Sequence, residues 1–184
     1  MGIKELFSSI LTILFRYRKF WRELKADGRT EELDLQREYA VPVIALVQLM
    51  KFPLIGVPRT AMFFAIANFL VDVAALYLVT GGAAALLARS GAKNTQAKVL
   101  TIFCYSMTPV WLFELFYFTG SWSWLFAAFA LSYTLVISRN GLSVLFALDE
   151  ALCAAAMRNV ALFLVLVNGA AFLVIKALMR LFNF

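Results

Sequence analysis

Three ionisable side chains, Lys51, Asp72 and Glu114, lie inside long apolar stretches. A charge at membrane depth costs about 2.5–3.5 kcal/mol on insertion scales, so each needs a partner. At about 1.5 Å per helical residue, Lys51 and Glu114 lie roughly 6–9 Å below the predicted outer surface, where they can pair. Asp72 lies deeper, at about 16 Å. Its candidate partners are Asn68, four residues earlier on the same helix face, together with Asn168, Tyr105 and a water.

Two interpretations of these polar residues stay open at the level of sequence. In the first, Asp72, Asn68, Lys51, Glu114 and Asn168 line a proton- or ion-linked pathway, or a polar cavity between helices. In the second, they hold a helix bundle together by hydrogen bonds, with Lys51 extending its ammonium group outward. The second interpretation is favoured, because one carboxylate near the midplane is not the paired set of a coupled transporter.

The elements that position these residues are five apolar stretches, at about 40–57, 61–88, 99–118, 122–137 and 159–179. The chain of 184 residues is 63% hydrophobic, with a mean hydropathy of +0.84. Backbone groups inside a bilayer must be satisfied internally, so each stretch is expected to be a helix. The predicted fold class is therefore all-α: a polytopic membrane bundle of five transmembrane helices, preceded by an N-terminal amphipathic interfacial helix.

Proline and glycine predict where these helices bend or end. Lys51 and Pro53 interrupt the first stretch, and Pro109 favours a kink in the third, where the Thr108 hydroxyl can bond the freed carbonyl. The run 138–141 is expected to break the fourth helix. Asp149 is expected to cap the last helix, and Thr30 would cap a short helix if residues 26–38 form one rather than a solvated linker.

Residues 1–38 form a separate unit in this prediction, ahead of a transmembrane domain at 39–184. Apolar residues recur at helical spacing over 3–25, with polar residues between them. Such a helix either lies on the membrane surface or packs against the end of the bundle, and the sequence leaves both open. Residues 26–38 are strongly polar and are expected to form a linker.

The distribution of Lys and Arg predicts an orientation. With a cytoplasmic N-terminus, thirteen Lys and Arg residues lie inside and four outside. We therefore expect an integral protein of the cytoplasmic membrane with its C-terminus outside, and the family resemblance given below implies that this membrane is prokaryotic. Cys104 and Cys153 then lie toward the inside, where thiols stay reduced.

Several function classes lack support in the sequence. The chain has no His, and it contains no metal-binding spacing, nucleophile elbow or phosphate-binding loop. An enzyme using Asp72, Glu114 and Tyr105 as acid and base groups is therefore disfavoured. No cofactor or metal is expected. The aromatic and basic run 16–22 suits anionic headgroups rather than nucleic acid.

The third span contains Tyr105-Ser106-Met107-Thr108-Pro109, and Arg139-Asn140-Gly141-Leu142 follows the fourth. These motifs, with Asp149-Glu150-Ala151, resemble those of the Yip domain family of Ypt/Rab-interacting-type membrane proteins. The resemblance covers about 145 residues, and the compact chain is most similar to prokaryotic members of the family. It implies five spans, a cytoplasmic N-terminus and an exported C-terminus. The partners expected for this chain are membrane lipids, and other membrane proteins or further copies of the chain. GTPase binding is not expected, because the N-terminal region of members that contact Rab-type GTPases is longer than 38 residues.

Two functional hypotheses follow from the sequence. The first is a non-enzymatic scaffold or membrane-organising protein that acts through the N-terminal helix. The second is a small transporter, channel or lipid-moving protein that uses Asp72 in a polar cavity. Small residues in the second and fifth spans indicate close helix packing, within one chain or between copies.

Overall fold

The computed structural model describes residues 2–28, 35–88, 95–147 and 150–182, and these are helical with no strands. The helices are α1 (Ile3–Ala26), α2 (Val41–Met50), α3 (Phe52–Ile55), α4 (Pro58–Ala88), α5 (Thr95–Ser106), α6 (Thr108–Phe113), α7 (Ser123–Phe146) and α8 (Glu150–Leu181). Tighter or wider turns extend them: the π-helical η2 (Gln36–Ala40) and the 3₁₀ helices η3 (Glu114–Phe118) and η4 (Gly120–Trp122). The predicted all-α fold class is confirmed.

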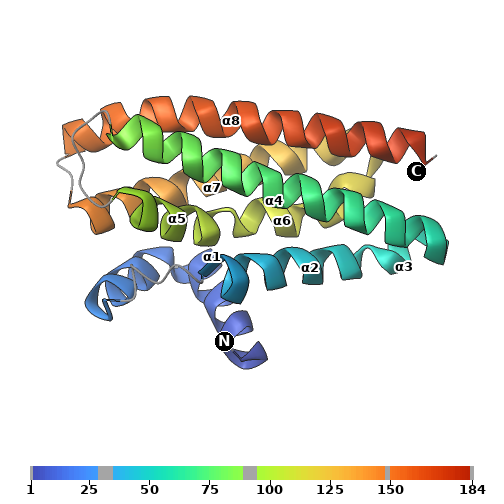
Figure 1. The fold of residues 1–184 in the computed structure, drawn as a ribbon, viewed down its shortest axis with the longest axis horizontal. Coiled ribbons are helices and arrows are strands. Elements are labelled where there is room, and N and C mark those ends of the chain that lie inside the picture. Colours follow the sequence, from blue (N-terminus) through green and yellow to red (C-terminus); the bar gives the residue numbers. More distant parts are fainter. Residues whose placement is uncertain (1, 29–34, 89–94, 148–149, 183–184) are drawn as a thin grey trace.

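Five of the described segments are long and apolar enough to cross a membrane: Gln36–Ile55, Pro58–Ala88, Gln96–Phe118, Gly120–Phe146 and Cys153–Leu181. They form one elongated bundle with α4 and α8 side by side (Figure 1). One sequence prediction is wrong. Residues 138–141 do not break the fourth span, because α7 continues through Gly141 to Phe146. The predicted caps Thr30 and Asp149 lie outside the described residues.

The first span bends at Lys51, as its sequence predicts. Pro53 has no amide hydrogen, so the helix restarts at Phe52, where missing N–H donors cost nothing. The Lys51 carbonyl accepts bonds from the amides of Leu54 and Ile55, at 3.0 and 3.2 Å. Gly56 then ends α3 with a φ of 75°, a left-handed conformation that other residues adopt at a cost. The Lys51 side chain at this junction is buried in the bundle.

The third span breaks at Met107, between α5 and α6. Pro109 removes the amide that would bond the Tyr105 carbonyl four residues earlier. The Thr108 hydroxyl donates to that carbonyl instead, at 2.7 Å, as predicted. The break is therefore internally satisfied and is a fixed part of the fold.

The long helices α4 and α8 pack closely at a small residue. A Cβ atom added at Gly82 would lie 2.1 Å from Cε1 of Phe163, whereas one at Gly81 would meet nothing within 4 Å. The predicted small-residue contact between the second and fifth spans is therefore made inside one chain at Gly82. Gly81 faces open space.

Helix α1 is kinked at Arg16, whose φ of −136° and ψ of 37° are not helical. We call residues 3–15 the first arm and residues 17–26 the second arm. The second arm lies along the end of the bundle opposite the C-terminus, and the first arm leaves the bundle sideways (Figure 1). Both arms bury apolar side chains against the bundle, so the second of the two expectations for this helix describes the contacts observed. The buried side chains are Leu6, Ile10, Ile13, Phe20, Trp21 and Leu24.

We predict that Gly82→Ala lowers the thermal stability of the purified protein, while Gly81→Ala does not. The new methyl group at Gly82 meets the Phe163 ring, and overpacking of this kind costs about 1–3 kcal/mol. Both substitutions share the same gain in helix propensity of about 1 kcal/mol, so the neighbouring variant is a matched control. Thermal unfolding in detergent measures the difference. Equal midpoints for the two variants would contradict the close contact.

Candidate functional site: an intramembrane polar cluster and the dock of α1

Four polar side chains from three segments meet inside the bundle. Lys51 donates to Oε2 of Glu114 at 2.5 Å and to Oε1 of Gln48 at 2.9 Å. Gln48 donates through Nε2 to Oδ2 of Asp72 at 2.7 Å and to Oε2 of Glu114 at 3.5 Å. All four side chains are at most 3% exposed. We call Gln48, Lys51, Asp72 and Glu114 the polar cluster.

The structure confirms the pairing expected for Lys51 and Glu114 and corrects the rest. Lys51 is 1% exposed, so its ammonium group does not extend outward. The partner of Asp72 is Gln48, which sequence reasoning missed. A signal was present, because Gln48 lies three residues before Lys51 in an apolar span and so on the same helix face. Its amide bridges the ion pair to Asp72, with the oxygen toward Lys51 and the nitrogen toward Asp72.

Asn68 lies one helical turn from Asp72 on α4 and is fully buried. Neither its Oδ1 nor its Nδ2 has a hydrogen-bond partner. A buried amide without partners costs about 1–3 kcal/mol, and such a group is rare in native proteins. Asn68 is therefore the polar side chain of this site whose bonding capacity is unused.

The other candidate partner residues of Asp72 make their contacts elsewhere. Asn168 donates to the Leu164 carbonyl of its own helix at 2.9 Å. The Tyr105 ring packs among aromatic residues, as described below. On the far side of Glu114, Lys176 of α8 donates to the Tyr117 carbonyl at 3.3 Å.

The second arm of α1 is held to the bundle by Trp21. Its indole Nε1 donates to the Ile137 carbonyl of α7 at 3.2 Å, and the ring is fully buried. The ring lies against Gly141, where a Cβ atom would come within 3.0 Å of Cε2 and Cζ2. Tyr133 adds a hydroxyl bond to the Leu14 carbonyl near the kink. Gly141 is thus the flat seat of Trp21 inside a continuous helix.

The motif residues of the third span complete this dock. Tyr105 contacts Phe20, Trp21 and Tyr39, with ring centroids 4.7, 6.2 and 4.4 Å apart. Since Thr108 donates its hydroxyl proton to the Tyr105 carbonyl, the bond of 2.8 Å between Tyr39 and Thr108 has Tyr39 as donor. Tyr105 and Gly141 therefore contact α1 directly, while Thr108 bonds Tyr39 and the Tyr105 carbonyl beside them.

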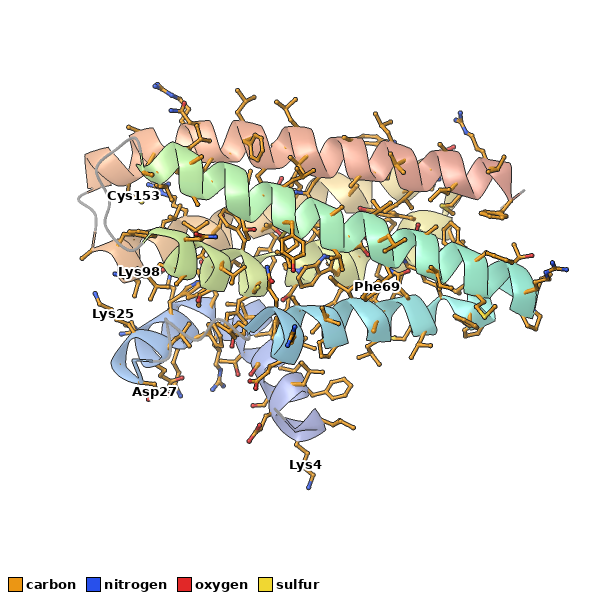
Figure 2. The ribbon with its side chains drawn as sticks, viewed as in Figure 1. Lys4, Lys25, Asp27, Phe69, Lys98 and Cys153 are labelled. Atoms are coloured by element: carbon orange, nitrogen blue, oxygen red, sulfur yellow. The ribbon has the colours of Figure 1, made fainter. Side chains whose placement is uncertain are left out.

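Two clefts border α1. One of about 600 Å³ lies between its two arms, the start of the first span and Tyr105. The other, of about 460 Å³, lies between α1 and α7 and is lined by Arg18, Arg139 and Asn140, among others. Figure 2 shows Lys25, Lys98 and Cys153 at this end of the bundle, from α1, α5 and α8, while Lys4 lies at the tip of the first arm. Basic side chains thus line the cleft between α1 and α7, whereas the cleft between the two arms is lined by Lys4 and by four acidic residues, Glu5, Glu23, Asp27 and Glu38.

No group of three or more His, Cys, Asp or Glu side chains in the described part of the chain is placed to hold a metal ion. Cys104 and Cys153 are buried free thiols. Comparisons with protein-family models, curated proteins and solved structures give no match. What the structure establishes is a class, a helical protein with five segments suited to span a membrane, and the Yip resemblance stays a prediction.

We predict that Lys51→Met destabilises the protein far more than Lys51→Met combined with Glu114→Met. The single change leaves buried carboxylates without their cation, a loss of about 3–5 kcal/mol, whereas removing both partners is often close to neutral. Yield and thermal unfolding of the purified proteins test this. A double variant as unstable as the single one would argue against direct pairing of the two residues.

We predict that Gly141→Val releases the second arm of α1. The added side chain occupies the seat of the Trp21 ring, so the arm must move. Gly169→Val is the control, since a Cβ atom there meets nothing within 4 Å. Limited trypsin digestion is expected to cleave between Arg16 and Lys25 faster only in Gly141→Val. Equal cleavage rates in both variants would show that the arm does not depend on this seat.

Proposed function

We propose that this chain is a non-enzymatic membrane-organising protein that acts through α1. One observation carries the proposal: the helix is fixed to the bundle, yet its first arm leaves large apolar side chains uncovered. These exposed side chains are Ile3, Phe7, Leu11 and Phe15. Their spacing of four residues places them along one side of the arm. An uncovered stripe beside membrane spans is suited to enter the lipid of one leaflet.

On this proposal, the first arm deforms the bilayer because it is attached rigidly to the bundle. Contacts with Tyr133 and Ile137 tie the kink region to α7, which belongs to a spanning segment. An inserted wedge that cannot move away from the bundle adds area to one leaflet wherever the protein lies. Each apolar side chain of this size contributes about 1.5–3 kcal/mol when fully removed from water.

The cleft between α1 and α7 supports lipid as the partner. Arg18 and Arg139 line it, and a basic residue near a membrane surface gains about 1 kcal/mol from anionic lipid. The proposal agrees with the partners expected from the sequence, which are membrane lipids and other membrane proteins. It places the N-terminus, and the end of the bundle where α1 docks, at the cytoplasmic leaflet.

Transport is a second candidate, and Asn68 is the observation that favours it. This amide is buried without partners beside a charged cluster, as expected for a group that meets a passing ion. On this hypothesis Asp72→Asn abolishes flux through protein-containing liposomes while the protein still folds. Unchanged flux would remove Asp72 as its mediator.

We predict that Phe7→Ala with Leu11→Ala removes most of the membrane remodelling of the purified protein. These side chains do not lie in the core, so the fold is expected to persist while insertion of the arm weakens. The control pair is Leu166→Ala with Leu173→Ala, which removes side chains from α8 that are 62 and 68% exposed, against 48 and 55% for the α1 pair. Electron cryo-microscopy of vesicles of phosphatidylcholine and phosphatidylglycerol measures their size and tubulation.

The control pair is expected to remodel vesicles as the wild type does. Full remodelling by the α1 pair, or equal losses in both pairs, would count against an active first arm. Loss of remodelling in Gly141→Val as well would show that the arm must be held in place.

A further inference from the structure

The polar cluster has an unbalanced charge. Asp72 and Glu114 supply two carboxyl groups, and Lys51 supplies one ammonium group. With all three ionised, the cluster carries one net negative charge in surroundings that are almost fully buried. An uncompensated charge in a low-dielectric interior is strongly unfavourable. One further positive charge makes the cluster neutral.

The missing charge belongs between the two carboxyl groups. Lys51 bonds directly to Glu114, but it reaches Asp72 only through the amide of Gln48. Asp72 and Glu114 also interact directly, and they repel when both are ionised. A small cation between the two carboxyl groups relieves this repulsion.

The unpartnered side chain of Asn68 is a second, independent observation that favours a ligand beside the carboxyl pair. Asn68 and Asp72 are four residues apart on α4 and so share the face that meets the cluster. The Asn68 carbonyl oxygen, a hard ligand like the carboxylates, has no hydrogen-bond partner. Asn68 is thus available as a third oxygen ligand.

We propose that Asp72, Glu114 and Asn68 bind one monovalent cation, either a proton or an alkali ion such as Na⁺. A divalent ion does not fit, because the cluster with Lys51 already present needs one positive charge. A proton requires only the carboxyl pair, whereas an alkali ion also requires the oxygen of Asn68. This site is independent of α1 and requires no flux across the membrane.

The charged and titratable groups around this site are few among the described residues. Lys51 lies at the α2–α3 junction, Glu114 and Tyr117 belong to η3, and Lys176 reaches the Tyr117 carbonyl from α8. The carboxyl pair is the group whose protonation the test below follows.

The test is thermal unfolding of the purified protein in detergent, at pH 5.5 and pH 8.5, in NaCl or choline chloride of equal ionic strength. We expect the midpoint to fall from pH 5.5 to pH 8.5 in choline chloride, because loss of the proton leaves the charge uncompensated. A fall of about 2–4 °C corresponds to about 1 kcal/mol for a chain of this size. Sodium is expected to restore the midpoint at pH 8.5 and to have no effect at pH 5.5.

Three variants locate the site. Asp72→Asn neutralises the cluster and is expected to remove both the pH and the sodium effect. Asn68→Ala is expected to remove the sodium effect and keep the pH effect. Asn168→Ala, the matched control, removes a buried amide that bonds its own helix, and is expected to keep both. If Asp72→Asn does not fold, Glu114→Gln combined with Lys51→Met, which leaves Asp72 as the single charge, is expected to keep the pH effect.

The outcomes separate the two cations. A pH effect without a sodium effect identifies the proton as the ligand, and both effects together identify an alkali site that a proton also fills. The proposal is overturned if the unfolding midpoint of the wild-type protein changes neither with pH nor with sodium. It is also overturned if the Asp72→Asn protein responds as the wild type does. Membrane remodelling is not measured here, so neither result depends on the role proposed for α1.

Discussion

The hydrogen bonds from Lys51 through Gln48 to Asp72 are the interaction on which the bundle depends most. Between helices in lipid the hydrophobic effect supplies little attraction, so close packing and polar bonds decide which helices meet. This chain of bonds ties the first span to α4, and the Lys51–Glu114 pair ties it to η3. The four side chains are buried, and their bonds join segments that are far apart in sequence.

The third span is the centre around which the others are arranged. It is 78% buried, whereas the other four are 22–44% buried. Tyr105 packs against α1 and Tyr39, and Thr108 bonds Tyr39. Six residues beyond Thr108, the same span contributes Glu114 to the polar cluster. Pro109 lies between these two contact surfaces, and the carbonyl that it leaves without an amide donor accepts from the Thr108 hydroxyl.

Much of this architecture is predictable from the sequence, for physical reasons. The bilayer forces apolar stretches into helices, so the five spans, the bend at Lys51 and the break at Pro109 follow from composition and proline chemistry. The Lys51–Glu114 pair follows from equal depth. Gln48 was missed because depth was applied only to ionisable residues. The run 138–141 was misread as a helix break because Gly141 was interpreted as a turn residue, whereas the Trp21 ring requires its missing side chain.

The contact between α1 and the bundle could not be predicted from hydrophobic periodicity either. An amphipathic pattern shows which side of a helix is apolar, but not whether lipid or protein covers it. In α1 the bundle covers one side only, since Leu6, Ile10 and Ile13 are buried while Phe7, Leu11 and Phe15 are exposed. The kink at Arg16 changes the direction of the helix and so which neighbours each arm meets. A helix that is half docked and half uncovered can present apolar surface to lipid without leaving the bundle, and this is why its attachment matters as much as its composition.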